Sequence, residues 1–321
     1  MSGAISYTIL KANNKEKEMN ECFFNVSLLM LVLSIILTIV LYFLANPIAI
    51  LLGAKGETLI YTTKYIKVII LGTIFQLLAT GFTPFIRNMG GSLFVMISMI
   101  LGFITNIILD YIFVWVLNLG MVGAALATII GQLVTLIFAI IYFIKKKCKL
   151  DFSSLKNNIL KEWGKILKVA LSPFSLTFSP TITMLLMNKF LLIFGNEQDV
   201  AIYGCIGYVV SIVYLLVQGV GDGSQPLISQ YYGEKDNKEV NSTCLKAYLL
   251  SGIITILSII VIFVLRDKIG ISFGSSNETN QGVIKYIIYF LLTLIFVAFT
   301  RITTSYLYAT KNIFIIYISL F

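Results

Sequence analysis

Long apolar segments alternate with short polar ones along this chain. Eight of the apolar segments reach the roughly 20 residues that a helix needs to cross a bilayer. They cover residues 22–45, 64–86, 93–118, 121–144, 165–194, 200–225, 242–265 and 281–310, and a ninth begins at Asn312. Because the bilayer core has no water to satisfy backbone groups, spanning segments of this composition must be helices. The pattern predicts an all-α, polytopic transmembrane helix bundle.

Composition supports this class and narrows the chemistry. The chain is 58% hydrophobic and 12% charged, with a mean hydropathy of +0.92, whereas about a quarter of the residues of soluble proteins are charged. It has no histidine, which is the commonest general base and metal ligand. Its four cysteines lack the spacing of metal ligands, so we expect them to serve packing.

The net charge of +9 is divided unevenly between the two membrane faces. With spans that alternate in direction, one face collects Lys11, Lys15, Lys17, Arg87, Lys235, Lys238, Lys311 and the dense run from Lys145 to Lys161. The opposite face has Lys55, Arg266, Lys268 and little else. Loops rich in lysine and arginine are cytoplasmic, which orients the chain. The basic residues form no folded soluble surface, so we expect no nucleic-acid partner.

The polar stretches of the chain repeat. The stretches 1–20 and 223–242 resemble each other, with identical residues 223 positions apart. After the first span the register continues with a two-residue slip, at an offset of 221. The matched residues of the first copy include Ile5, Ser6, Asn14, Lys15, Glu16, Gly53, Glu57, Thr58, Lys64 and Tyr65. Chance rarely matches polar loop residues in one frame. Since an even number of spans separates the copies, they have one orientation and form parallel repeats.

The repeat predicts two lobes of six helices, both incomplete in this chain. The spans that precede the second copy should also precede the first, so we expect roughly 60 residues before Met1 and roughly 45 after Phe321. The N-terminal lobe then covers residues 1–144 and the C-terminal lobe residues 165–321. Residues 145–164 form a basic cytoplasmic linker, either a short amphipathic helix on the membrane surface or a plain solvated segment.

Polar and small side chains form stripes on the spans 93–118 and 121–144. The first span carries Ser98, Gly102, Asn106 and Asp110 at every fourth position. The second carries Ala124, Thr128, Gln132 and Thr135, and beside them Gly123, Ala127 and Gly131. Residues at this spacing share one helix face, and small residues allow helices to approach closely. The short turn between the spans makes them antiparallel neighbours, so the stripes can face each other.

Asp110 is the sharpest candidate because it places a carboxylate inside an apolar span. Such groups are costly unless paired and indicate a functional site. Burial would raise the pKa of Asp110 toward the range in which it exchanges a proton near neutral pH. Alternatively, its oxygens and those of Asn106 and Thr128 supply part of a Na+ shell. A hydrogen bond that only packs helices, or an interfacial carboxylate, is the plain alternative.

Other polar groups inside the spans are candidates for a substrate cavity. They are Gln76, Thr80, Gln132, Gln218 and Arg301. Hydrogen bonding between helices explains the uncharged ones equally well. Three roles stay open for Arg301, since its side chain can extend toward the interface, pair with Asp222, or line the cavity of the second lobe.

Three segments resemble the MATE family of multidrug and toxic compound extrusion transporters, and its bacterial DinF-like branch in particular. They are "NIILDYIFV", "LGMVGAALATIIGQ" and "GVGDGSQPLISQYYGEKD". The similarity runs from the second to the start of the eleventh of the family's twelve helices. It implies two bundles around a central cleft, and export of bulky, often cationic compounds against entry of H+ or Na+. It also implies that Asn106, Asp110 and Thr128 contribute to a cation site with an aspartate of the first helix.

We therefore predict a cation-coupled multidrug antiporter that works by alternating access in a bacterial cytoplasmic (inner) membrane. Its expected partners are small-molecule substrates and the lipid bilayer, and it is expected to be a monomer that uses no cofactor besides the coupling ion. The alternative is a flippase for lipid-linked oligosaccharides or polysaccharides, which Arg301 favours. An embedded enzyme would need paired acids at one depth, whereas Asp110 and Asp222 come from opposite membrane sides.

Overall fold

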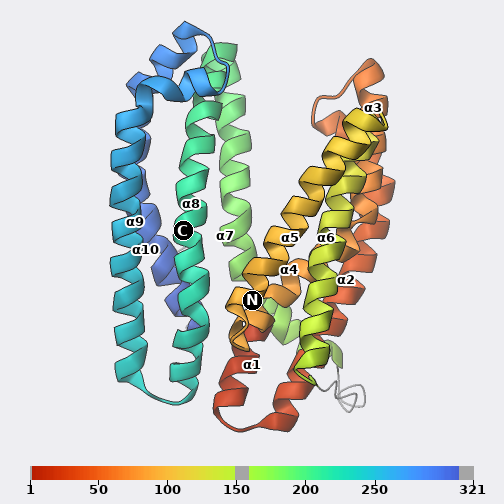
Figure 1. The fold of residues 1–321 in the computed structure, drawn as a ribbon, viewed down its shortest axis with the longest axis vertical. Helices are drawn as coiled ribbons and strands as arrows, with labels where there is room; N and C mark the ends of the chain where they lie inside the picture. The colour runs from red at the N-terminus through yellow and green to blue at the C-terminus, as the bar shows by residue number, and fades with distance from the viewer. Residues whose placement is uncertain (1, 149–158, 311–321) are drawn as a thin grey trace. The chain divides into compact units, whose positions relative to one another are not determined.

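The computed structural model describes residues 2–148 and 159–310, and in these residues all regular structure is helical. The chain divides into two compact units, Met1–Ile166 and Leu167–Phe321. Each unit is described by itself. The predicted polytopic helix bundle is confirmed, because six of the described helices are long and apolar enough to cross a membrane and a bent pair forms a further candidate span (Figure 1).

The first unit consists of α1 to α6. Its elements are α1 (Ser2–Ala12), α2 (Glu16–Leu51), α3 (Gly56–Leu71), α4 (Thr73–Asn88), α5 (Ser92–Asp110), the π-helix η1 (Tyr111–Val116) and α6 (Gly120–Lys145). α5 packs against α6, α6 also contacts α3 and α4, and α1 folds back on α2 and α4. At the α1 end of the unit, aromatic rings meet edge to face, with 5.0 Å between the ring centroids of Phe23 and Phe143. Burial raises the pKa of the Cys148 thiol beside this cluster, which agrees with a packing role.

The span predicted at residues 64–86 is not one straight helix. α3 and α4 meet at Gly72 with a bend of 48°. A side chain at Gly72 would collide with Ile129 of α6, so α6 packs directly onto the bend. The sequence analysis predicted a helical span here but not its bend. Glycine is common in continuous transmembrane helices, so Gly72 alone did not indicate a bend; the contact with Ile129 explains it.

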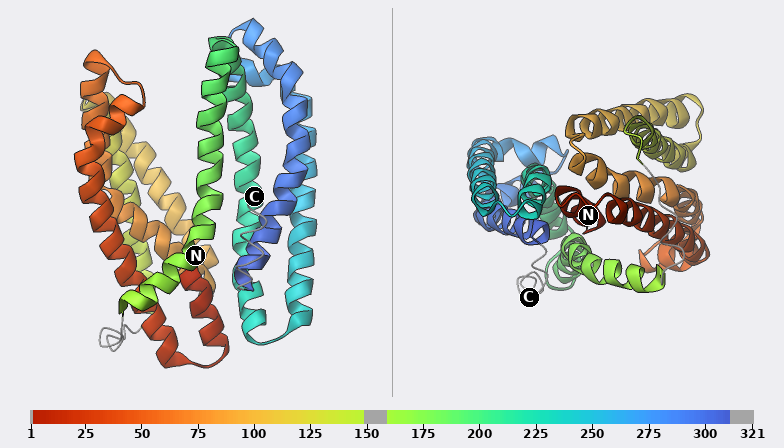
Figure 2. Two further views of the ribbon diagram at one scale, coloured as in Figure 1. Left: turned by 180° about the vertical axis from the view of Figure 1, so that it is seen from behind. Right: turned by 90° about the horizontal axis from the view of Figure 1, so that it is seen from below.

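The second unit contains most of α7 (Ile159–Phe194), and α8 (Glu197–Gly233), α9 (Asn237–Ser272) and α10 (Asn277–Ala309). α8, α9 and α10 pack side by side, as the two views of Figure 2 show. Their starts are set by local polar chemistry, since the side chains of Asn196, Asp236 and Ser276 accept hydrogen bonds from the first turns of α8, α9 and α10. Such caps satisfy backbone donors that have no partner within the helix.

The first and last residues of the helices show that the two copies of the repeat are related by one constant offset. α2 and α9 are both 36 residues long, and each bound of α9 lies 221 positions after that of α2. The same offset relates the end of α1 to the end of α8, and Gly56–Asn88 to α10. The turns before α2 and α9 also agree, since φ is 57° at Asn14 and 61° at Lys235.

The offset of 223 predicted for the opening stretch is therefore wrong. That offset rests on a few identical residues. In the structure, equivalent positions are those with the same turn geometry and the same burial. At an offset of 221, the buried positions Ala4, Ile5, Tyr7 and Thr8 correspond to the buried positions Gln225, Pro226, Ile228 and Ser229. The residue types differ, but the pattern of contact with neighbouring helices is the same.

Two predictions fall at the edge of the described chain. For the predicted span 165–194, α7 is a continuous helix, and its described apolar stretch is Phe178–Phe194. Half of the predicted linker, residues 149–158, lies outside the described residues, whereas its last part from Ile159 is the start of α7. The ninth segment from Asn312 lies wholly outside them.

Candidate functional site

The polar stripes of α5 and α6 face each other at very short range. A Cβ atom added to Gly131 would lie 2.8 Å from the carbonyl oxygen of Gly102 and 3.1 Å from Cβ of Asn106. Gly123, Ala127 and Gly131 are all buried. The predicted close approach of the two spans is confirmed, and it depends on small residues because any larger side chain would separate the backbones.

This approach brings Asn106 and Thr128 together. The Nδ2 atom of Asn106 donates to the hydroxyl oxygen of Thr128 at 3.5 Å. The Thr128 hydroxyl in turn donates to the carbonyl oxygen of Ala124 at 3.0 Å. Thr135 makes the equivalent bond to Gly131, at 3.2 Å. The threonine hydroxyls are therefore held against their own helix, with oxygen lone pairs directed toward α5.

Asp110 is the last residue of α5 and lies one turn beyond Asn106. Its Oδ1 atom is buried and accepts no hydrogen bond. A buried carboxylate oxygen without a donor is costly, since nothing in the protein replaces its lost hydration. Such an atom suits a site that a proton or a cation completes.

The π-helix η1 begins directly after Asp110. Short π-helical turns are rare, and they are frequent at functional sites because they shift side chains out of α-helical register. The prediction of a span at residues 93–118 did not include this change of helix type. Residues 93–118 contain no proline that would have indicated it. From Tyr111 onward, the side chains leave the stripe that Asp110 ends.

The donor atoms of this site fit a hard cation in type. The carboxylate of Asp110, the amide oxygen of Asn106 and the hydroxyl of Thr128 are all oxygen ligands, which alkali and alkaline-earth cations prefer. Three side chains provide only part of a coordination shell. The described residues contain no group of three or more histidine, cysteine or acidic side chains that could hold a metal ion, at this site or at any other.

The remaining predicted cavity residues lie in separate units. Gln76 and Thr80 are exposed one turn apart on α4, and Gln132 is half-buried on α6. In the second unit, Gln218 and Arg301 are half-buried on α8 and α10. The guanidinium carbon of Arg301 lies 5.1 Å from the ring centroid of Tyr214.

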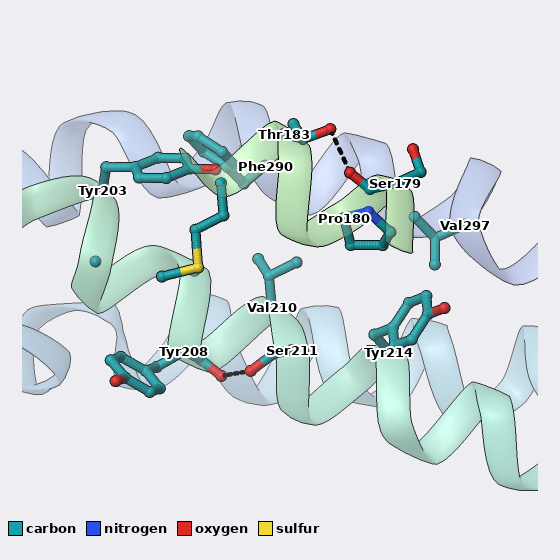
Figure 3. A pocket seen from close by; sticks show the side chains of 13 residues that line it. Ser179, Pro180, Thr183, Tyr203, Tyr208, Val210, Ser211, Tyr214, Phe290 and Val297 are labelled. Atoms are coloured by element: carbon teal, nitrogen blue, oxygen red, sulfur yellow. Dashed lines mark hydrogen bonds between the residues drawn. The ribbon is translucent and has the colours of Figure 1, made fainter. Parts of the chain in front are cut away.

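The structure has a cavity in the second unit whose wall residues were not predicted from the sequence, since neither Gln218 nor Arg301 is part of that wall. It has a volume of about 500 Å³ and lies between α7, α8 and α10 (Figure 3). Its wall includes Tyr203, Tyr208 and Tyr214 of α8, and Phe290 and Val297 of α10. The sequence clue was the mixture of tyrosine and glycine in "YGCIGYVVSIVY", but such a stripe predicts a hollow only when the facing helices are known.

Comparisons of the sequence with known proteins agree on one family. The sequence model of the MatE family matches residues 6–112 and 169–321. The multidrug export protein MepA of Staphylococcus saprophyticus is 34% identical over 237 residues, which cover 73% of this chain and 50% of that protein. MepA of Staphylococcus aureus is 32% identical over 258 residues, which cover 79% of this chain and 55% of that protein. The chain thus spans about half the length of these relatives.

Solved structures share the fold. A crystal structure of a mutant of the Vibrio cholerae MATE transporter VcmN superposes with a TM-score of 0.90 at 18% identity, over 99% of this chain and 72% of that one. An outward-facing multidrug resistance MATE family transporter superposes with a TM-score of 0.84 at 23% identity, over 98% of this chain and 72% of that one. At these identities the likeness is one of fold.

Proposed function

The chain belongs to the MatE family, and from this we propose that it acts in secondary active efflux, exporting bulky, often cationic organic compounds in exchange for H+ or Na+. The names of its relatives in Staphylococcus support multidrug export. The proposed mechanism is alternating access, in which the two facing states bind the driving cation with different affinity. Only such differential binding allows an ion gradient to shift the equilibrium between them.

The buried oxygen of Asp110 carries this proposal. It has no hydrogen-bond donor, so protonation or cation binding there removes a large desolvation cost. A state in which α5 and α6 expose this carboxylate to water would lower that cost and weaken cation binding. Asp110 is thus the group whose occupancy is coupled to the facing state.

Asn106 and Thr128 have a supporting role in this scheme. They are neutral, and they contact each other across α5 and α6. With Na+ as the coupling ion, their oxygens and the Asp110 carboxylate would hold part of its shell. With H+, they would orient the protonated carboxyl group by hydrogen bonds.

The proposed setting is the cytoplasmic membrane of a bacterium, where the protein acts as a monomeric transporter and performs no covalent chemistry. Its outer surface fits a lipid bilayer. Phe43 and Trp115 are 79% and 77% exposed, and tryptophan is enriched where a membrane protein meets the interface between lipid and water. Small organic molecules are the proposed cargo.

A flippase for lipid-linked oligosaccharides is the second candidate. One observation favours it, namely the cationic Arg301 beside the apolar cavity of the second unit. An apolar wall with a cation at one end suits an acyl chain attached to a phosphate. Transport of a labelled lipid-linked sugar, with no transport of organic dyes, would favour this function over drug export.

The test uses the native protein in proteoliposomes loaded with a fluorescent organic cation, under imposed pH or Na+ gradients. We expect Asp110→Asn to abolish gradient-driven efflux, because the amide keeps the shape of the side chain but neither titrates nor carries charge. Asn106→Ala and Thr128→Ala should each raise the cation concentration needed for half-maximal efflux by a few fold, since each removes one neutral ligand.

Asp267→Asn is the matched control. Asp267 is an exposed carboxylate on α9, with its Oδ1 atom 3.7 Å from Arg266. Its neutralisation should leave efflux unchanged. Full efflux by Asp110→Asn under both gradients would remove Asp110 from the coupling mechanism and contradict the proposal.

A further inference from the structure

The cavity of the second unit has a wall without charge. None of the thirteen side chains that line it is acidic or basic. Its volume of about 500 Å³ lies within the range of about 300–1,000 Å³ that is usual for sites of drug-sized molecules. The hydroxyls of Thr183 and Ser211 donate to carbonyl oxygens of their own helices, at 3.0 and 2.7 Å. These two polar groups are therefore already satisfied, which leaves a mostly apolar, aromatic lining.

The cavity arises where α8 carries tyrosines on either side of glycines, which have no side chain. Tyr203 and Tyr214 project from α8 at the two ends of the cavity, as Figure 3 shows. Between them, Gly204 and Gly207 leave open space, since an added Cβ would meet no atom within 4 Å at either position. At the Tyr203 end, the ring of Phe290 completes an aromatic pair with a centroid distance of 6.1 Å.

The two ends of the cavity differ in polarity. Phe290, Val297 and Arg301 lie along one face of α10, because residues 7 and 11 positions apart recur on the same side of a helix. Arg301 thus continues the lining stripe by one turn beyond Val297, and its guanidinium lies over the Tyr214 ring. On α8, Gln218 follows Tyr214 by one turn. Asp222 follows Gln218 by a further turn and has a partner of its own. One end of the cavity is thus aromatic, and toward the other end lie a cation, an amide and, one turn beyond the amide, a carboxylate.

We propose that this cavity binds amphiphilic organic anions, with the apolar body between the tyrosines and a carboxylate or phosphate head at Arg301. An anionic head can form charge-assisted hydrogen bonds with the guanidinium. A cationic head would meet the positive charge of Arg301 without an acidic group in the wall to offset it. As a site for transported compounds, the cavity rests on the proposed efflux function, but binding itself can be tested without transport.

The test compares three probes that share a naphthalene ring. The purified native protein in lipid nanodiscs is titrated with 2-naphthoate, neutral 2-naphthalenemethanol and 2-naphthyltrimethylammonium, and heats of binding are measured. We expect 2-naphthoate to bind about tenfold more tightly than the trimethylammonium compound, as one hydrogen bond to a charged group allows. Dodecyl phosphate in competition identifies the source of the anion, since stronger competition than by 2-naphthoate indicates a lipid-like head group.

Substitutions test the role of Arg301 directly. Arg301→Gln should remove the preference for the anion, and Arg301→Lys should keep most of it. Arg266→Gln is the matched control, because Arg266 also lies over an aromatic ring, that of Phe263 at 4.4 Å, but on α9 outside the cavity wall. It should leave all three affinities unchanged.

Two results would overturn the proposal. One is equal or tighter binding of the cationic probe by the native protein. The other is that Arg301→Gln weakens the binding of all three probes equally and also lowers the unfolding temperature. Arg301 would then have a packing role only. Since no gradient is used, a failure of the Asp110→Asn efflux test leaves these binding results unaffected, and the two proposals fail separately.

Discussion

At the scale of single residues, the two candidate sites depend on different features, an acidic side chain in the first unit and missing side chains in the second. Asp110 is a partly buried acidic residue whose buried Oδ1 atom has no hydrogen-bond partner, so that one oxygen is open to a ligand. Gly204 and Gly207 contribute by leaving space. The sequence pattern identified Asp110 because a carboxylate within an apolar span is rare. It did not identify the two glycines, since a glycine leaves a cavity only where the neighbouring helices do not fill the space, and the sequence does not show where those helices lie.

Filling the cavity from α8 should block it without disturbing the helix. We expect Gly207→Leu to weaken binding of all three naphthalene probes at least tenfold, because the leucine side chain would occupy the space between the tyrosines. The helix should not suffer, since leucine is a better helix former than glycine by nearly 1 kcal/mol. Calorimetric titration and a thermal unfolding curve measure the two effects.

Gly219→Leu is the control for this substitution. Gly219 lies on the same helix, and an added Cβ there also meets nothing within 4 Å, but the residue is not part of the cavity wall. It should leave probe binding intact. If Gly207→Leu bound the probes as well as the native protein does, the cavity would not be their site.

At the scale of elements, hydropathy placed the spans well but located their ends and breaks poorly. Helix α2 runs from Glu16 to Leu51, well past the predicted 22–45, because a polar stretch at its start and the mostly apolar residues 46–51 at its end remain helical. The π-helix after Asp110 and the bend at Gly72 were missed for a common reason. Neither follows from local propensity: the bend at Gly72 packs against Ile129 of α6, far away in sequence, and no proline lies in residues 93–118 to indicate the π-helix.

The bend at Gly72 should depend on Ile129. We expect Gly72→Ala to lower the free energy of unfolding by about 1–3 kcal/mol, because its new methyl group overlaps the Ile129 side chain. Ile129→Ala in the same chain should recover part of this loss, so that the two substitutions together cost less than the sum of their separate effects. Thermal unfolding in detergent measures each variant.

Gly223→Ala provides the reference value, since an added Cβ at Gly223 meets no neighbour. It should be neutral or slightly stabilising. Strict additivity of Gly72→Ala and Ile129→Ala would show that the bend is not held by this contact.

At the scale of the whole molecule, the repeat relates the two units through equal helix lengths rather than through identical residues. The bend of the first unit has no counterpart in the second, where Thr293 occupies the position of Gly72 within the continuous helix α10. The two copies have thus kept their helix bounds while the side chains between them diverged.

If the repeats are parallel, equivalent positions must lie on the same membrane face. Two pairs at an offset of 221 test this, Lys17 with Lys238 and Glu57 with Glu278, and all four side chains are exposed. We expect single cysteines at Glu57 and Glu278 to react with a membrane-impermeant thiol reagent on intact cells. Cysteines at Lys17 and Lys238 should react only after permeabilisation, because lysine-rich loops are cytoplasmic.

The measurement requires a background in which Cys22, Cys148, Cys205 and Cys244 are replaced by serine or alanine and efflux is retained. The decisive comparison is within each pair. Equal labelling of Glu57→Cys and Glu278→Cys from outside supports parallel repeats that share one membrane orientation. Labelling of one member from outside and the other only from inside would make the repeat inverted, and the cytoplasmic assignment of its lysine-rich turns would then fail for one unit.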